Sequence, residues 1–215
     1  MIKEKYIIEP IDYKTAETVV VKCHYAHRKC SCVKSFGLFS KSPKRLVGVI
    51  IYGIPASPFV CRCICGKSEE LNVYELTRLY VDDGLENNLE SYFISKTLKM
   101  LDRDIVISYS DTAYNHIGYV YQACNFIYTG ITSSRFDPVS ENGKHNRHNK
   151  NTVQNGKIER SQKHRYIYFA CSKGKRRYYM SKLQLPILPY PKSDKPCAKT
   201  SDINISDNVT KRNLF

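Results

Sequence analysis

The order of predicted strands and helices is the feature that most constrains this chain. Along its first 131 residues, segments in which apolar residues alternate, as in strands, are interspersed with segments in which they have helical spacing. The predicted elements are a strand at Lys5–Glu9, a helix at Tyr13–Cys23, strands at Lys34–Phe39, Arg45–Tyr52 and Asn72–Val81, a helix at Asn87–Leu101, a strand at Ile105–Tyr109, a helix at Ala113–Ala123 and a strand at Asn125–Ile131. The order β-α-β-β-β-α-β-α-β predicts an α/β fold with a mixed central sheet flanked by helices.

A change in composition follows this region. From Ser133 to Arg165 the chain is rich in Asn, His, Lys, Arg, Gly and Ser, too polar to offset the entropy of ordering. Beyond it we expect a strand at Arg165–Ala170, a short helix after the basic segment Lys173–Arg177, and an extended stretch at Leu185–Lys192, which contains three prolines. We therefore predict a core at 1–131, a mobile basic loop at 132–164, a basic strand and helix extension packed on the core at 165–192, and a disordered tail at 193–215.

The chain is strongly basic. It has 34 Lys and Arg against 20 Asp and Glu, a net charge of +14, which indicates anionic partners such as phosphate backbones. No apolar run approaches the roughly 18–20 residues of a membrane helix, and the first residues lack the apolar segment of a secretory signal. Nine cysteines without the spacing of a disulfide scaffold are typical of a reducing cytosol. We expect a cytoplasmic protein with no membrane partner.

Two groups of cysteines raise the question of a structural metal. The first comprises Cys23, His24, His27, Cys30 and Cys32, and the second Cys61, Cys63 and Cys65. Zinc sites usually show C-x2-C or C-x4-C pairs, and neither group does. Alternation predicts that the second group shares one face of an extended segment, which is more often simple apolar packing. Both interpretations stay open.

Three segments of the chain follow one another in an order that can be compared with known protein families. They are Glu75–Val81 (ELTRLYV), the turn and helix after it, and Gly118–Gly130 (GYVYQACNFIYTG). Together they resemble the central strand, the following helix, and the last core helix and strand of the Gcn5-related acyltransferase (GNAT) family. The resemblance implies a GNAT-like sheet whose central strand ends at an acyl-CoA site.

Further segments make the resemblance more specific. These are His24-Tyr25, Leu46–Ser57, Ser108–Asp111, Arg165–Phe169 and Leu188–Lys192. In their order and spacing they resemble the Mom-type DNA-modification proteins of bacteriophages, a family understood to convert adenine to an N6-carbamoylmethyl derivative that protects phage DNA from host restriction enzymes. The resemblance implies an adenine N6-modifying transferase that works in the cytoplasm of an infected bacterium. Its partner would be double-stranded DNA with the adenine flipped out, because N6 is paired in a duplex.

The resemblance also implies roles for individual residues. Tyr121 falls at the position of the general-acid tyrosine of GNAT enzymes. Asp111 and Tyr121 would flank the sheet end where Arg78 emerges, and open α/β sheets bind ligands at the carboxyl ends of their strands. We expect Asp111 to act as base or orienter for the adenine amine, Tyr121 as acid for the leaving group and Arg78 as an anion clamp. His24 and Ser108 complete the candidate catalytic residues.

Ordinary structural roles stand beside these assignments. An Asp just before a helix is a common N-cap, which applies to Asp111. A single tyrosine on an amphipathic helix, such as Tyr121, is more often core packing. Arg78 could be paired with Glu75 or with an Asp of the next turn.

The residues leave the identity of the cofactor open. In the GNAT fold a glycine-rich turn holds the CoA pyrophosphate at a helix N-terminus, whereas Asp82–Ser91 keeps only Gly84 among acidic neighbours. Candidate cofactor contacts are Leu79, Tyr80, Asn88 and Ser91. The acyl donor could be acetyl-CoA or an activated glycine, because a glycyl group has the same atoms as a carbamoylmethyl group. Iron and zinc also stay open, with His24 and Asp111 as candidate ligands.

Basic and aromatic residues that could contact DNA are interleaved in the C-terminal part. Cations there would neutralise phosphates, and tyrosines could stack on an exposed base. With two sites from the Leu46–Ser57 segment added, the candidates are Tyr52, Ser57, Lys144, Arg147, Arg165, Tyr166, Lys175, Arg176 and Arg177. The oligomeric state is open, a homodimer being one option.

Two other function classes fit the same residues. One is a GNAT-type N-acyltransferase acting on a protein or tRNA amine, which the glycine-poor turn and the basic arm disfavour. The other is a non-catalytic nucleic-acid-binding protein, which would bind DNA without changing it. A methyltransferase is disfavoured because the sequence has neither a D/N-P-P-Y/F segment nor a glycine-rich cofactor loop.

Overall fold

The computed structural model of the chain describes residues 2–138 and 157–192. Its helices, 3-10 turns (η) and strands are α1 (Ile2–Lys5), β1 (Tyr6–Pro10), α2 (Tyr13–Cys23), β2 (Lys34–Lys41), β3 (Lys44–Gly53), α3 (Pro58–Cys65), η1 (Lys67–Asn72), β4 (Val73–Val81), α4 (Leu89–Thr97), η2 (Leu98–Met100), β5 (Ile105–Asp111), η3 (Thr112–Tyr114), α5 (Tyr119–Ala123), β6 (Ile127–Ile131), β7 (Arg135–Pro138), β8 (Lys157–Arg160), β9 (Lys163–Phe169) and α6 (Lys173–Lys182). None of the helices in these ranges is long and apolar enough to cross a membrane.

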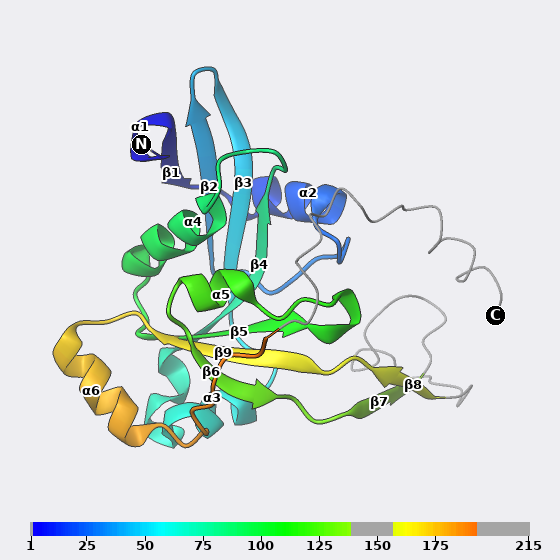
Figure 1. Cartoon of the computed structure of the whole chain (residues 1–215), viewed down its shortest axis with the longest axis vertical. Coiled ribbons are helices and arrows are strands. Elements are labelled where there is room, and N and C mark those ends of the chain that lie inside the picture. The colour runs from blue at the N-terminus through cyan, green and yellow to red at the C-terminus, as the bar shows by residue number, and fades with distance from the viewer. Residues whose placement is uncertain (1, 139–156, 193–215) are drawn as a thin grey trace.

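Seven strands form one mixed sheet in the order β1-β2-β3-β4-β5-β9-β6, and β7 and β8 form a separate hairpin. The β4–β5 pair is parallel, and the other neighbours in the large sheet are antiparallel. Figure 1 shows β1–β4 aligned along one axis and β5, β9 and β6 crossing them at a large angle. This architecture confirms the predicted α/β fold with a mixed central sheet flanked by helices.

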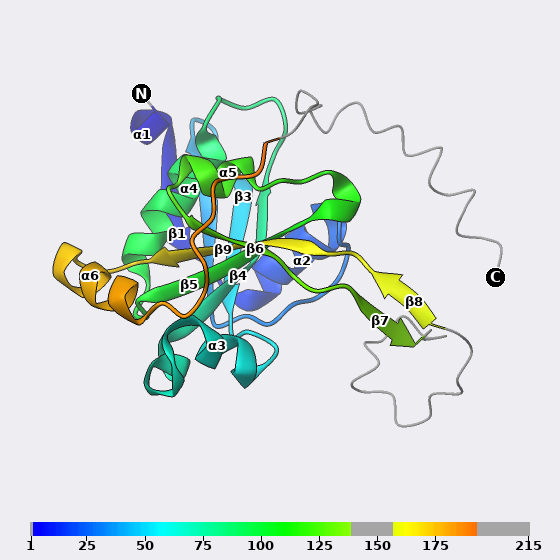
Figure 2. The same ribbon diagram turned by 60° about the horizontal axis from the view of Figure 1, so that its bottom comes forward.

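Helices cover both faces of the sheet (Figures 1 and 2). On one face α4 and α5 bury a large cluster that includes Phe93, Tyr121 and Tyr166. On the other face α3 and α6 pack on the β5–β9 half, and α2 packs on β3 through Ala16 and Val20. The sheet is therefore the middle layer, and its strands alternate between the two cores, as period-2 side chains require.

The sheet is split between β4 and β5. These strands pair only from Val73 and Ile105 to Leu76 and Ser108. Beyond that point β4 continues to Val81 against β3, and β5 continues to Asp111 against β9. We call the diverging segments, residues 77–81 and 109–111, the split; their facing backbone edges have no strand partner between them.

The elements expected in the first 111 residues agree with the structure to within a few residues. The helix at Tyr13–Cys23 has the predicted bounds, and the Asp12 side chain caps it by accepting from the Thr15 amide at 2.9 Å. The helix expected at Asn87–Leu101 is shorter and ends as α4 and η2. These elements were predictable because each carries a clear period of buried apolar residues.

The helix expected at Ala113–Ala123 is wrong. The structure has η3 and, after a break, the five-residue α5. Asn115 and Gly118 both adopt left-handed backbone conformations, with φ of 54° and 78°, which no continuous helix allows. At Gly118 a Cβ would lie 2.5 Å from the Tyr166 ring, so this position also needs the absent side chain.

The extended segment expected around Cys61–Cys65 is also wrong, because this stretch is the helix α3. Pro58 occupies its first turn, where a fixed φ and a missing N–H suit a helix start. Cys61, Ile64 and Cys65 are spaced three and four residues apart and are buried on one helix face. Apolar packing of these two cysteines, one of the two interpretations above, is therefore what the structure shows.

The region after Ile131 is more ordered than the composition suggests. Parts of the predicted mobile loop form the β7–β8 hairpin, while residues 139–156 lie outside the described residues. The strand expected at Arg165–Ala170 is β9, which is hydrogen-bonded to β5 and β6 inside the sheet and is not an addition packed onto it. The stretch Leu185–Lys192 is free of helix and strand, as its prolines predict. The tail 193–215 lies outside the described residues.

Gly118 provides a test of how the chain passes from β5 to α5. Gly118→Ala should lower the free energy of unfolding by about 1 kcal/mol or more, because the left-handed backbone and the contact with the Tyr166 ring both oppose a Cβ. Gly174→Ala is the matched control, since a Cβ at this helical position meets nothing within 4 Å and should stabilise by about 0.5–1 kcal/mol. Urea denaturation measures both, and equal effects would contradict the proposed role of Gly118.

Candidate active site at the split between β4 and β5

A one-residue bulge decides which side chains meet at the split. In the β3–β4 register Glu75 pairs with Gly53, Leu76 with Tyr52, and Arg78 with Ile51, so Thr77 is the extra residue. A bulge of one residue reverses the alternation of side chains across a strand. Glu75 and Arg78, three residues apart, therefore lie on the same face, the one that carries α2 and α3.

Aromatic rings gather over this face. His24 and Tyr25 follow directly after α2, with ring centroids 4.2 Å apart. The Tyr25 ring lies 4.6 Å from Tyr114 and 5.5 Å from His116, both from the loop after β5. Tyr25 and Tyr114 remain about 40% exposed (42% and 38%), so their rings form an accessible surface beside the split. The break in the expected helix is what brings Tyr114 and His116 here.

Arg78 lies in the split as a half-buried cation with unused hydrogen-bonding capacity. Its Nη1 donates to the carbonyl of Thr77 at 2.6 Å, and its Nε is buried without a partner. Among the described residues one other buried side-chain polar atom has no partner, Ser110 Oγ, on the β5 side of the split. A buried guanidinium with a free donor is suited to an anion. The alternative pairing of Arg78 with Glu75 or with an Asp is not formed within the described part of the chain.

Asp111 is held by several groups. Its Oδ1 accepts from the Ala113 amide at 3.0 Å, the N-cap role expected as an alternative, and its Oδ2 lies 3.3 Å from Lys163 Nζ. Burial alone would raise the pKa of Asp111, but hydrogen bonds from Ser161 and Ala113 and the Lys163 ammonium together lower it. A carboxylate with a lowered pKa is better suited to orienting groups than to accepting a proton.

Tyr121 is buried on the opposite face of the sheet from Arg78. Its ring packs against Phe126 and Tyr166 at centroid distances of 5.4 and 5.3 Å. Burial raises the pKa of its phenol, and the adjacent Ser108 offsets this only in part. Ser108 itself is buried and donates to the Leu76 carbonyl, at the last paired position of β4. The phenol therefore holds its proton next to the split, and the core packing expected as the alternative role of Tyr121 is formed.

Two charged residues of the site were absent from the sequence-based candidates. Glu75 lies on β4 just before the split, and Lys163 lies on β9 directly opposite Asp111. The carboxyl group of Glu75 interacts electrostatically with Lys163 and with Arg78. Glu75 was part of the ELTRLYV segment, but the bulge that turns its side chain toward Arg78 leaves no signal in the sequence.

The expected cofactor contacts are mostly engaged with the protein. Leu79 packs on the core, and the Tyr80 hydroxyl donates to Asp82. Asn88 is the N-cap residue of α4, with a left-handed φ of 66° and no capping bond from its side chain. Ser91 donates to the Asn88 carbonyl at 2.9 Å.

Cations and tyrosines hold the acidic turn before α4. Asp82 pairs with Arg45 at 2.7 Å, and Glu86 pairs with Lys5 at 2.8 Å and accepts from the Tyr6 hydroxyl. These contacts tie the turn to β1 and β3, so two of its carboxylates have a structural use.

The donor atoms at His24 do not fit a metal site. Its Nδ1 accepts a hydrogen bond from the Ala26 amide at 3.1 Å, so the ring proton resides on Nε2. A metal needs an unprotonated nitrogen, and the one that His24 has is already used. Within residues 2–138 and 157–192, no group of three or more His, Cys, Asp or Glu side chains could hold a metal ion. His24 is then not suited to bind iron or zinc, and Asp111 belongs to no such group within the described residues.

The expected DNA contacts are scattered over the molecule. Tyr52 and Tyr166 are 0% exposed, with their hydroxyls bonded to Thr97 and to the Ile117 carbonyl, so neither can stack on a base in this conformation. Ser57 precedes α3. Arg165 donates to Thr129 at the hydroxyl and the carbonyl. Lys144 and Arg147 lie outside the described residues.

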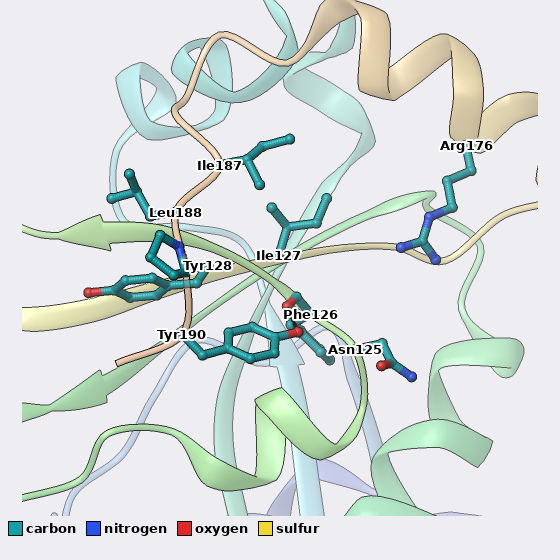
Figure 3. A pocket seen from close by; sticks show the side chains of 9 residues that line it. Asn125, Phe126, Ile127, Tyr128, Arg176, Ile187, Leu188 and Tyr190 are labelled. Atoms are coloured by element: carbon teal, nitrogen blue, oxygen red, sulfur yellow. Dashed lines mark hydrogen bonds between the residues drawn. The ribbon is translucent and has the colours of Figure 1, made fainter. Parts of the chain in front are cut away.

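Lys175, Arg176 and Arg177 belong to α6, at the far end of β9 from Asp111. A seven-residue strand spans about 20 Å, so these cations are remote from the split. Lys175 pairs with Asp104 at 3.0 Å. Arg176 lies over the Tyr168 ring and reaches from α6 to a pocket of about 390 Å³ (Figure 3). The other residues lining it are Asn125, Phe126, Ile127, Tyr128, Ile187, Leu188, Pro189 and Tyr190. The pocket shares no residue with the split.

Cations closer to the split were missed by the sequence analysis. Arg28, in the loop after α2, is exposed and lowers the pKa of the Tyr25 phenol in opposition to burial. Arg135, the first residue of β7, is exposed and acts in the same way on Tyr109. Together with Lys163, which pairs with Asp111, they bring positive charge to residues at or next to the split. Their separation in sequence, 28, 135 and 163, hides this grouping.

His24 generates a prediction about pH. Burial, then the positive charges of Arg78, His27 and His116, lower its pKa to about 4. An unfolded histidine titrates near 6.5, so the unfolded state binds more protons between these values and stability falls as the pH drops from about 6.5 to about 4. His24→Gln should reduce this loss, as measured by urea denaturation at pH 7 and pH 4.5. An NMR titration in which the His24 ring protonates near pH 6.5 would contradict the prediction.

Known proteins resemble this chain along most of its length. The model of the Mom protein family matches residues 5–192. The methylcarbamoylase Mom of Escherichia phage Mu is 25% identical in an alignment of 204 residues that covers 86% of this chain and 83% of that protein. A match that extends from β1 to the last described residue includes every element of the split.

Solved structures of acetyltransferases are also similar. A Bacillus subtilis acetyltransferase in complex with CoA is 14% identical, with a TM-score of 0.44, over 77% of this chain and 99% of its own. The ribosomal-protein-S18-alanine N-acetyltransferase of Escherichia coli is 10% identical, with a TM-score of 0.47, over 79% and 97%. The resemblance seen in the sequence motifs is confirmed by the family match: this chain belongs to the Mom protein family.

Proposed function

We propose that this protein is a DNA-modifying transferase that attaches a carbamoylmethyl-type group to N6 of adenine and so protects DNA from host restriction enzymes. The family membership and the phage Mu relative named a methylcarbamoylase support this proposal. The observation that carries it is the convergence at the split of an anion-binding guanidinium, a protonated phenol and an open aromatic surface. N6 lies in the major groove, where a bulky group removes a donor and obstructs recognition of the A·T pair.

The residues at the split suit transfer to a weak nucleophile. The lone pair of N6 is delocalised into the adenine ring, so positioning and charge stabilisation matter more than a base alone. Arg78, with its unpartnered Nε, would bind the oxyanion or a negatively charged part of the donor. Tyr121, whose pKa is raised, would protonate the leaving group. Asp111, paired with Lys163, would orient the adenine amine, and His24 would offer its Nε2–H as a hydrogen-bond donor.

The composition of the product limits the donor. Plain acetyl transfer would leave N6–CO–CH3, which lacks the nitrogen of a carbamoylmethyl group. A glycyl group, N6–CO–CH2–NH2, has the same atoms as N6–CH2–CO–NH2. Attack of N6 on an activated glycine followed by rearrangement would therefore give the product. The free backbone edge of β4 beyond Leu76 is where an extended donor could pair.

DNA would approach the face that carries Tyr25 and Tyr114. Exposed aromatic rings can stack on a flipped base, and each stack contributes about 1–3 kcal/mol. The surrounding cations Arg28, Arg135 and Lys163 would contact phosphates. The α6 cations Lys175, Arg176 and Arg177 stay a prediction for a second DNA-binding surface, about 20 Å along the sheet.

The first test is chemical analysis of DNA. DNA from bacteria that express the protein should contain a deoxyadenosine that is heavier by one carbamoylmethyl group, detected by mass spectrometry of nucleosides. Tyr121→Phe should reduce it at least tenfold, because the phenol proton is lost while the ring packing remains. Asp111→Asn should reduce it as well, through loss of orientation.

Three outcomes would contradict the proposal or the mechanism assigned to it. Unmodified DNA from cells with soluble protein, even when glycine and the phage host background are supplied, would favour a non-catalytic DNA-binding protein. Undiminished modification by the Tyr121→Phe variant would remove Tyr121 from the mechanism. Acetylated protein or tRNA in place of modified adenine would favour the ordinary acyltransferase.

The second test locates the DNA. The logarithm of the DNA-binding constant falls linearly with the logarithm of the salt concentration. The double variant Arg28→Ala and Arg135→Ala should make this slope less steep by about 2, roughly one for each phosphate that the protein no longer neutralises. The matched control, Lys173→Ala with Arg177→Ala, removes two exposed cations of α6 and should change the slope less. A larger change in the control would move the DNA to the α6 side.

A further inference from the structure

The β7–β8 hairpin stands out from the body of the molecule. Both views show it beyond the ends of β6 and β9 (Figures 1 and 2). Within the described residues its strands pair only with each other, from Arg135 and Arg160 to Pro138 and Lys157. An isolated two-stranded ribbon has little stability of its own in water. Such a ribbon adds little to the core of the protein and is suited to contact a partner.

Hydrogen bonds fix the sheet end of the hairpin beside the split. Lys163 lies opposite Asp111, the last residue of β5. The amide and the hydroxyl of Thr112 both donate to the Gln162 carbonyl, at 3.2 and 2.8 Å. Gln162 Nε2 donates to the Thr132 carbonyl at 3.1 Å, and the Thr132 amide donates to the Lys163 carbonyl at 2.9 Å. The hairpin therefore begins at the candidate active site, in a fixed position relative to Asp111.

Phe136 is a large apolar side chain exposed on this hairpin. It is 61% exposed, and Glu159, directly opposite, is exposed and accepts from Ser134 at 2.7 Å. Four residues of chain separate Glu159 from Lys163, which is at most about 14 Å when fully extended. Single exposed apolar residues are ordinary on protein surfaces. Phe136 differs from them in its place, on a projecting ribbon that begins at the candidate active site.

The other face of the ribbon carries two arginines. Arg135 and Arg160 are directly opposite each other, and the alternation of side chains puts them on the face away from Phe136. Two like charges in this arrangement repel each other, and a phosphate that approaches them reduces the repulsion. Arg135 also interacts electrostatically with the Tyr109 phenol, at the split. The remaining charged residues of the hairpin are Asp137, Lys157 and Glu159. An apolar ring on one face and two guanidinium groups on the other match the bases and the phosphates of a nucleic acid.

A duplex that presents a flipped adenine offers two separate places for aromatic contacts. The flipped base itself would stack on Tyr25 and Tyr114 at the split. Its removal leaves a gap in the base stack, and the extrusion costs unstacking and unpairing energy. A Phe side chain inserted between base steps is one of the wedges that proteins use at such a step. The major groove, about 12 Å wide, admits a two-stranded ribbon, so Phe136 could reach the gap while the adenine lies at the split.

We propose that the β7–β8 hairpin enters a groove of duplex DNA beside the adenine, where Phe136 fills the gap that the flipped base leaves. This inference rests on the proposed function. Arg135 and Arg160 bind phosphates that flank the gap. The fixed sheet end of the hairpin sets the distance between the gap and the split. The partner of this surface is therefore a paired duplex, and an adenine that is already unpaired makes little use of Phe136.

The decisive experiment measures base flipping without the reaction. Duplexes carry 2-aminopurine in place of several adenines; this base fluoresces when it leaves the stack and has no amino group at position 6 to be modified. Wild-type protein should raise the fluorescence. Phe136→Ala should lower this rise by about fivefold or more at equal occupancy of the DNA, because the loss of one base–aromatic contact has at least that effect.

Matched variants keep this result specific. Phe59→Ala removes another exposed phenylalanine, 70% exposed on α3, and should leave the fluorescence unchanged. Phe136→Trp keeps an aromatic wedge and should retain most of the rise. Both phenylalanines are exposed, so their truncation leaves no cavity in the core and the variants should fold like the wild type.

A second measurement compares two DNA substrates in single turnover. Phe136→Ala should slow the modification of a paired adenine by about fivefold or more. Modification of an adenine opposite an abasic site, where no base pair has to be opened, should change less than about twofold by the same argument. An equal loss on both substrates would assign Phe136 to general DNA binding and overturn the proposal.

The outcomes separate this inference from the proposed function. If Phe136→Ala, or Phe59→Ala to the same extent as Phe136→Ala, changes the fluorescence in a way other than expected, the role of Phe136 is overturned, and modified adenine in the wild-type experiment leaves the function standing. If the wild type modifies no adenine but still opens the 2-aminopurine duplex through Phe136, the proposed function fails and the role of the hairpin stands.

Discussion

The candidate site depends on one constraint, the short pairing of β4 with β5. Only four residue pairs join these parallel strands before β4 follows β3 and β5 follows β9. Beyond Leu76 and Ser108 the facing backbone edges of the two strands are not paired with each other. In the same segments Arg78 Nε and Ser110 Oγ are buried without a partner, which a protein tolerates where a ligand completes the bonding.

The two faces of the sheet make different contributions at this point. The α4–α5 face supplies Tyr121, held by aromatic packing that keeps its phenol protonated. The opposite face supplies Glu75, Arg78, His24 and the exposed rings of Tyr25 and Tyr114. A donor placed in the split would then meet an acid from one side and the nucleophile from the other. The residues around the split therefore come from both layers of helices and not from a single loop.

The acidic turn before α4 is fastened by its own carboxylates. They bind Arg45, Lys5 and Tyr6, and so tie the turn to α1, β1 and β3. These contacts neutralise two carboxylates before a helix N-terminus, the kind of position that attracts a pyrophosphate in other proteins. An activated glycine, the donor of the proposed function, would not require a pyrophosphate site at this turn.

The sequence by itself determined the α/β class, the bounds of α2, the approximate positions of the outer strands β1 and β6, and the family motifs, because residues buried at regular intervals leave a periodic pattern in the sequence. It also pointed to Arg78, Asp111, Tyr121 and His24. Tertiary structure alone decided where their side chains lie: the bulge at Thr77 aligned Glu75 with Arg78, the left-handed residues Asn115 and Gly118 broke the expected helix, and β9 inserted into the sheet to bring Lys163 to Asp111. Each of these depends on register or on contacts between distant segments, and a linear pattern carries no record of either.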